Sequence, residues 1–161
     1  MQRSIKNRGH LQAGFSAPET LIVVLVISIL VVIAIPNVSK TLDLRLLETY
    51  SSVVSNKMTE TRTYAIKHNR TAWLRIDPAN RTSQIQTTDT AGNTINLKAA
   101  ELLPARIAIA ETSPVEFRFD SMGRLTTGTE TVTFQLTASG QTKSKAITVS
   151  PAGKILVGSM H

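Results

Sequence analysis

The most constraining feature of this sequence is an apolar run at residues 21–35, where 13 of 15 residues are leucine, isoleucine or valine. A helix extended back to Phe15 has 21 residues, enough to cross a hydrocarbon layer of about 30 Å. The thirteen apolar residues favour insertion by about 5 kcal/mol together, at roughly 0.4 kcal/mol each, whereas Glu19 opposes it by at most about 3 kcal/mol. The sequence therefore predicts a membrane-spanning helix over residues 15–36.

Charges on either side of the run predict its orientation. The excess of basic residues before it favours a cytoplasmic amino terminus and a carboxy-terminal domain on the other side of the membrane. The alternative is a secretory signal peptide that is cleaved after Ala34, although no good small-x-small cleavage site follows the run. The flanking basic residues are Arg3, Lys6 and Arg8 before the run, and Lys40 and Arg45 after it.

The helix is predicted to continue beyond the run. Apolar positions recur at spacings of three to five residues as far as about Asn69, which is typical of a helix that packs along one side. Residues 16–69 would then form one helix about 80 Å long, at 1.5 Å per residue. Pro36 stands at the junction and predicts a kink, because it lacks an N–H. The recurring positions are Val38, Leu42, Leu46, Tyr50, Val53, Met58, Thr61 and Ala65.

After residue 69 the pattern changes to a period of two, which indicates strands. We expect the single tryptophan, Trp73, to pack on the sheet together with Phe117, Phe119 and Phe134. Residues 97–103 are predicted to add one helical turn. The fold class is therefore α+β, with a long helix on an antiparallel β domain over residues 70–161. The strands are expected at residues 72–76, 83–87, 94–97, 106–110, 115–119, 131–137, 145–149 and 155–157, with turns at 77–80, 90–93, 120–123 and 138–140.

Composition argues against catalysis and metal binding. The chain has no cysteine, so it has neither a disulfide framework nor a cysteine nucleophile. Its histidines, His10, His68 and His161, lack the spacing of a zinc motif, and His68 is expected to cap the helix end or face solvent. No Gly-x-Ser-x-Gly elbow or glycine-rich phosphate loop is present. We therefore expect no enzyme activity, no metal and no cofactor.

The amino terminus carries a specific combination of residues: a short basic leader ending in Gly14, then Phe15, then Glu19 four residues later, the apolar run, and Pro36 closing it. This combination resembles the amino terminus of type IV pilins and type II secretion pseudopilins. The resemblance implies that prepilin peptidase cleaves between Gly14 and Phe15, and that Phe15 becomes N-methylated. Pro18 stands where the family usually has leucine or isoleucine.

The same resemblance implies a role for Glu19 in subunit assembly, where its carboxylate pairs with the amino group of Phe15 of a neighbouring subunit. An ionisable group in hydrocarbon requires such a partner. A local alternative stays open, because Ser16 and Glu19 fit a capping box, with Pro18 tolerated in the first helical turn.

The carboxy-terminal third is similar to the GspH/FimT-type pseudopilin domain. The similarity rests on the strand and turn at residues 115–126, the strand at 132–136, and the strand and closing turn at 146–155. Gly123 and Gly153 are expected to be turn glycines with positive φ. The chain then divides into a leader at residues 1–14, a membrane and filament-core helix at 15–36, its amphipathic continuation at 37–69, and a GspH/FimT-like β domain at 70–161.

The resemblance implies a minor pseudopilin, a structural subunit of the pseudopilus of a type II secretion system or of a type IV pilus. Its expected location is the bacterial inner membrane, as a single-pass protein with a periplasmic carboxy-terminal domain. Its expected partners are other pseudopilins or pilins, prepilin peptidase, the inner-membrane assembly platform and the membrane itself.

A second function class is DNA binding for natural transformation, as in some FimT-like minor pilins. The formal charge is +7, but three basic residues lie in the leader, so residues beyond Gly14 carry 15 basic and 11 acidic groups. The excess basic residues are enough for a few contacts to DNA phosphates. Lysines on a strand face more often serve solvation, so assembly is the favoured function. The candidate DNA-contacting residues are Arg124, Lys143, Lys145 and Lys154.

Overall fold

The computed structural model describes residues 16–138 and 140–161, and for residues 34–40 and 138 it describes the backbone alone. The chain divides into two compact units, Met1–Ser39 and Lys40–His161. A single helix, α1 (Ala17–His68), belongs in part to each unit. The predicted cleavage and methylation positions, Gly14 and Phe15, lie outside the described residues.

In the first unit, every described side chain of α1 from residue 17 to residue 33 is exposed. Among the described residues, no helix is long and apolar enough to cross a membrane. The predicted membrane-spanning segment, residues 15–36, begins at a residue outside the described part and ends among residues of which the backbone alone is described. The helix continues through Pro36, and the side chain of that residue lies outside the description.

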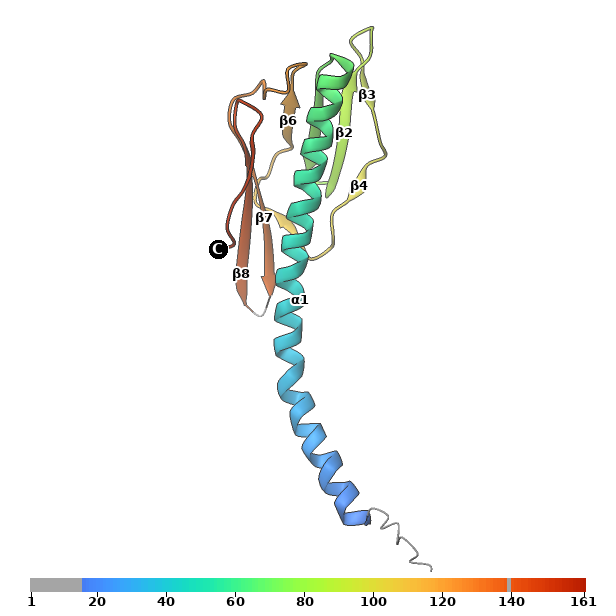
Figure 1. Cartoon of the computed structure of the whole chain (residues 1–161), viewed down its shortest axis with the longest axis vertical. Coiled ribbons are helices and arrows are strands. Elements are labelled where there is room, and N and C mark those ends of the chain that lie inside the picture. The colour runs from blue at the N-terminus through green and yellow to red at the C-terminus, as the bar shows by residue number, and fades with distance from the viewer. Residues whose placement is uncertain (1–15, 139) are drawn as a thin grey trace, which may run out of the picture. The chain divides into compact units, whose positions relative to one another are not determined.

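In the second unit, two antiparallel sheets pack along the rest of α1, with β7 and β8 on one side of the helix and β2 and β4 on the other (Figure 1). One sheet has the order β3-β2-β1-β6, with β4 also paired to β2, and the other has the order β5-β7-β8-β9. The strands are β1 (Ala72–Asp77), β2 (Thr82–Thr88), β3 (Thr94–Asn96), β4 (Glu101–Leu102), β5 (Ala108–Ile109), β6 (Val115–Phe119), β7 (Glu130–Ala138), β8 (Gln141–Val149) and β9 (Ile155–Val157).

This architecture confirms the predicted fold class. Each predicted strand is present, β6 and β9 with the predicted ends and the others with shifted ends. The largest extension is at β8, which starts four residues earlier than expected. The predicted helical turn at residues 97–103 is wrong, because β4 forms there and pairs with β2. Ion pairs from Lys57 to Glu101 and from Lys98 to Glu60 hold this segment beside α1, so tertiary contacts override its local helical preference.

The core lies between α1 and the inner faces of both sheets. The predicted apolar positions Tyr50, Met58, Thr61 and Ala65 are buried there. Phe117, Phe119 and Phe134 are fully buried in this core, as the sequence predicted. Trp73 packs on the sheet as predicted and is nearly buried, but on the outer face of the first sheet. The rings of Tyr50 and Phe134 are arranged edge to face, with a centroid distance of 5.2 Å.

The amino-terminal part of the predicted stripe is wrong by one position. Leu42 is 60% exposed, whereas Asp43 and Leu47 face the core. The physical reason is an ion pair between Asp43 and Arg106, which places an acidic residue on the side of the helix that faces the sheets. Hydrophobic periodicity cannot detect a buried carboxylate whose partner lies more than 60 residues away.

Two turn glycines meet side by side at the end of the domain where α1 finishes. Both have positive φ, 74° at Gly123 and 75° at Gly153, as the sequence predicted. The guanidinium Nε of Arg62 donates a hydrogen bond of 2.8 Å to the carbonyl oxygen of Gly123. A Cβ atom on Gly153 would overlap that same carbonyl oxygen. The close approach of these turns therefore joins both sheets to the helix at one point.

Replacing Gly153 by alanine should lower the free energy of unfolding by about 2–4 kcal/mol, because the methyl group would overlap the Gly123 carbonyl and strain the backbone. Gly92→Ala is the matched control, since Gly92 has φ 87° and open space around it. It should cost only backbone strain, about 1 kcal/mol. Denaturant unfolding of the full chain in detergent measures both changes. Equal losses would contradict the proposed close contact.

Candidate assembly site

Glu19 lies in the first turn of α1, where a negative charge interacts favourably with the helix dipole. The carbonyl oxygen of Ser16 accepts hydrogen bonds from the N–H groups of Glu19 and Thr20, at 3.0 Å and 3.2 Å. Pro18 fits this turn because its missing N–H needs no partner there. Within residues 16–138 and 140–161, the Glu19 carboxylate has no hydrogen-bond or ion-pair partner, and the two side-chain bonds of a capping box are not formed.

The surface that follows Glu19 is apolar all around the helix. The twelve leucine, isoleucine and valine residues between positions 21 and 33 are each between 47% and 72% exposed. The one hydroxyl group at residues 21–33, that of Ser28, donates a hydrogen bond of 2.7 Å to the carbonyl oxygen of Val24 and so needs no partner outside the helix. A continuous apolar surface of this kind is stable only against lipid or other apolar helices.

The four candidate DNA-contacting residues lie at two places. Arg124 and Lys154 follow the adjacent turn glycines Gly123 and Gly153, whereas Lys143 and Lys145 lie on β8. Arg124 already pairs with Asp120, at 2.9 Å in the turn after β6. Hydrogen bonds from the backbone N–H and the side chain of Arg124 contribute to holding the pKa of the Asp120 carboxyl below its ordinary value, despite partial desolvation. Arg124 therefore offers a partly neutralised charge to any anion.

The three lysines are spread along the second sheet. Lys143 and Lys145 lie on β8, opposite Leu136 and Phe134 of β7, on the face of the sheet that carries the core. Lys154 lies in the turn beyond β8, where its carbonyl oxygen accepts from the N–H of Ser150. About 16 Å of strand, at 3.3 Å per residue, separates Lys145 from Ser150. The four predicted contacts therefore do not form one cluster.

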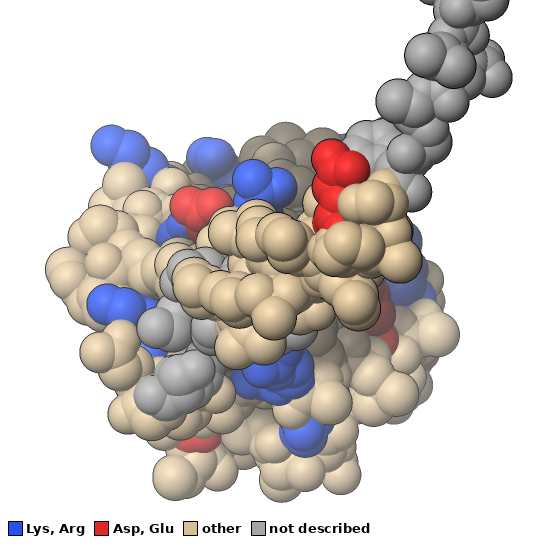
Figure 2. Space-filling model, turned by 90° about the horizontal axis from the view of Figure 1, so that it is seen from below, with Lys and Arg blue, Asp and Glu red and all other residues tan. Residues whose placement is uncertain are grey.

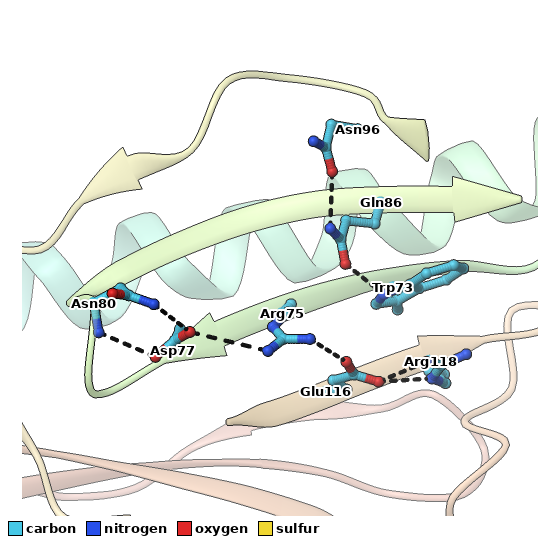
Figure 3. Close-up of polar contacts among 8 residues, drawn as sticks. All are labelled: Trp73, Arg75, Asp77, Asn80, Gln86, Asn96, Glu116 and Arg118. Atoms are coloured by element: carbon cyan, nitrogen blue, oxygen red, sulfur yellow. Dashed lines mark hydrogen bonds and ion pairs between the residues drawn. The ribbon is translucent and has the colours of Figure 1, made fainter. Parts of the chain in front are cut away.

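Other arginines are also paired, on the outer face of the first sheet (Figure 3). Glu116 accepts two hydrogen bonds from Arg118, at 2.7 Å and 2.9 Å, and one from Arg75 at 3.4 Å. The guanidinium of Arg118 also lies over the ring of Trp73, 4.4 Å from its centroid. In the view along the helix from its amino-terminal side, charged residues of both signs lie in separate places among uncharged ones (Figure 2).

Asp43 and Arg106 form an ion pair that the sequence did not predict. Their two contacts are 2.6 Å and 3.0 Å long, in a bidentate arrangement. The Asp43 side chain is 5% exposed, so Arg106 compensates a carboxylate that is removed from water. The pair fastens the segment before β5 to α1, close to the boundary between the two units at residues 39 and 40. No local motif marks either residue.

No group of three or more histidine, aspartate and glutamate residues in the described part of the chain is arranged to hold a metal ion. The described residues provide an exposed apolar surface on the amino-terminal half of α1, and a folded domain that packs against the rest of that helix. Residues 54–153, more than half of the chain, match the family of the type II transport protein GspH. This chain belongs to the GspH family.

Two solved structures share the fold of this GspH-type protein. The type IV minor pilin FimU of Pseudomonas aeruginosa has 17% sequence identity and a TM-score of 0.54, over 70% of this chain and 88% of FimU. The minor pseudopilin EpsH of the type 2 secretion system of Vibrio cholerae has 13% identity and a TM-score of 0.55, over 70% of this chain and 96% of EpsH. No curated protein matches the sequence.

These findings confirm the resemblance to GspH/FimT-type pseudopilins. The chain is a minor pseudopilin or pilin of the GspH type, with a helix packed on antiparallel sheets. The family consists of structural subunits and implies association with other pseudopilins or pilins.

Arg106→Leu should lower the free energy of unfolding by about 1–3 kcal/mol, because it leaves the buried carboxylate of Asp43 without its partner. Lys98→Leu is the control, since both side chains of the Lys98–Glu60 pair are about half exposed. Its cost should be less than about 0.5 kcal/mol. Thermal unfolding of the full chain in detergent compares the variants. Similar stability losses for both would mean that burial of Asp43 is unimportant.

Proposed function

We propose that this GspH-type protein is a minor structural subunit of an inner-membrane pseudopilus or type IV pilus, and that it assembles through the amino-terminal half of α1. Prepilin peptidase removes residues 1–14 and Phe15 is then N-methylated. Before assembly the protein resides in the inner membrane, with its amino terminus cytoplasmic and its β domain periplasmic. The inner-membrane assembly platform then transfers it into the filament.

The observation that carries this proposal is the helix surface from residue 17 to residue 33. Its side chains are exposed and almost all apolar, with Glu19 as its single acidic group. In the membrane that surface is covered by lipid, and in a filament by the helices of neighbouring subunits. Because the same apolar surface serves in both environments, the subunit can move between them at a small cost in free energy.

Glu19 gives the filament state its advantage. Its carboxylate has no partner within the described residues, and an unpaired charge in hydrocarbon costs up to about 3 kcal/mol. The amino group of Phe15 of an adjacent subunit would compensate that charge. Such a contact joins different surfaces of two copies, which is the kind of contact that builds open helical assemblies. The same pairing would also set the axial register between subunits.

Leader removal is tested by the intact mass and the amino terminus of the protein recovered from membranes. In cells with an active prepilin peptidase we expect a chain that begins at a methylated Phe15. In cells without the peptidase the chain should begin at Met1. A chain that begins at Met1 in both cases, or after Ala34, would contradict the proposed processing.

Glu19→Val should block incorporation into the filament while leaving membrane insertion intact, or more favourable by up to about 3 kcal/mol. The measurement compares the amounts of protein in the membrane and filament fractions. Ser28→Ala is the matched control, because the Ser28 hydroxyl bonds only within its own helix and its loss should not affect assembly. Incorporation of the Glu19 variant at the level of the parent would exclude the pairing.

A further inference from the structure

The outermost strand of the second sheet, β9, is unusually open to pairing. It contains only Ile155, Leu156 and Val157, and β8 is its one neighbour in the sheet order. Leu156 is 47% exposed and Val157 is 44% exposed. Edge strands are normally protected by a charge, a proline or a covering segment, because their free N–H and C=O groups pair readily with another chain. No residue of β9 provides such protection.

The hydrogen-bond pattern identifies which main-chain groups are free. Gly158 donates to the carbonyl oxygen of Ala146, at 2.8 Å, and Ser150 donates to that of Lys154, at 3.0 Å. In an antiparallel pair the direction of these groups alternates from residue to residue. The N–H and C=O groups of Ile155 and Val157 therefore point away from β8. No hydrogen bond to these four groups occurs within the described part of the chain.

A groove of about 580 Å³ lies next to this edge. The sheet contributes Val157 and Lys145 to its walls, and α1 contributes Glu48, Ser52 and Ser55. Val157 lies on the inner face of the sheet, because it is opposite the buried Ile147 in β8. A strand added beside β9 would thus direct alternate side chains into the groove.

Lys145 indicates the charge of what the groove accepts. It lies on the same inner face, opposite the buried Phe134, and is only half-buried itself. Within residues 16–138 and 140–161 its amino group has no ion-pair partner. The helix side of the groove carries an acidic group, Glu48, so the compensation is local: a carboxylate beside Lys145 would pair with its amino group, whereas a basic group there would be repelled.

We propose that β9 accepts an extended segment from a neighbouring pilin-like subunit as an additional strand. The segment pairs with the main chain of Ile155 and Val157, places an apolar side chain beside Val157, and directs a carboxylate to Lys145. Main-chain hydrogen bonds supply affinity in this mode of recognition, and the groove supplies specificity. The inference rests on the proposed assembly function, and adds a contact between β domains to the contact between helices.

The test uses the full chain in cells that assemble the filament, with Leu156 replaced by benzoylphenylalanine, a photoreactive residue. After irradiation, mass spectrometry identifies the cross-linked peptides. We expect cross-links to an extended segment of another pilin-like subunit. Val157→Pro should reduce them about tenfold, because it removes an N–H that faces outwards and hinders pairing along the edge. The N–H of Val157 makes no bond to β8, so the sheet itself should tolerate this proline.

Two matched controls separate pairing from folding. Val157→Ile keeps the main-chain donor and a branched apolar side chain, so its cross-linking should equal that of the parent. Lys145→Glu should also reduce cross-linking about tenfold, whereas Lys143→Glu, two residues away and outside the groove, should not. Thermal unfolding of each variant reports on folding. If Val157→Pro fails to fold, the comparison of the two lysine variants still decides.

The outcomes distinguish this inference from the proposed function. Cross-links that map to a partner helix, or that persist in both Val157→Pro and Lys145→Glu, overturn strand addition. Absence of cross-links while the parent enters filaments in a Glu19-dependent way overturns strand addition alone. Absence of the parent from filaments overturns both proposals.

Discussion

The whole structure depends on one helix that satisfies its apolar surface in two different ways. From Leu47 onwards, α1 buries a stripe of side chains against two sheets, and these side chains form one core with those of the strands. From residue 21 to residue 33 the same helix has apolar side chains in every direction, all exposed. Burial of large aliphatic side chains is worth roughly 1.5–3 kcal/mol each. The helix surface at residues 21–33 therefore requires an apolar partner as strongly as the surface from Leu47 onwards does.

Polar contacts along α1 then decide how the connecting segments lie. Each contact joins a helix residue to a connecting segment or to the short strand β4, and each has a modest energy because one partner is at least partly exposed. Their combined effect is positional, since they hold the crossing between the two sheets and the two glycine turns against the helix. They are Asp43–Arg106, Lys57–Glu101, Glu60–Lys98 and the hydrogen bond from Arg62 to Gly123.

This division of surfaces suits a GspH-type subunit. The two sheets and the carboxy-terminal half of α1 complete one core. In the proposed function this unit would therefore remain folded before and after assembly, while the apolar half of the helix would exchange lipid for neighbouring helices. In the proposed strand addition, the uncharged edge at β9 and the groove beside it add a second surface, whose described lining includes the basic Lys145 and the acidic Glu48. A subunit that contacts its neighbours at two separated surfaces gains both affinity and a fixed orientation.

The sequence alone determined the features that have a local signature. The apolar run, the period-two strands, the positive φ at Gly123 and Gly153, and the family were all predictable, because each is written in consecutive residues. Tertiary structure decided the rest. The ion pair of Asp43 with its distant partner Arg106 determined which side of α1 is buried. β4 formed where a helical turn was expected, and the four candidate DNA-contacting residues lie at two separate places. Such outcomes depend on which distant segments meet, and pairing partners across a fold leave no periodic trace in one sequence.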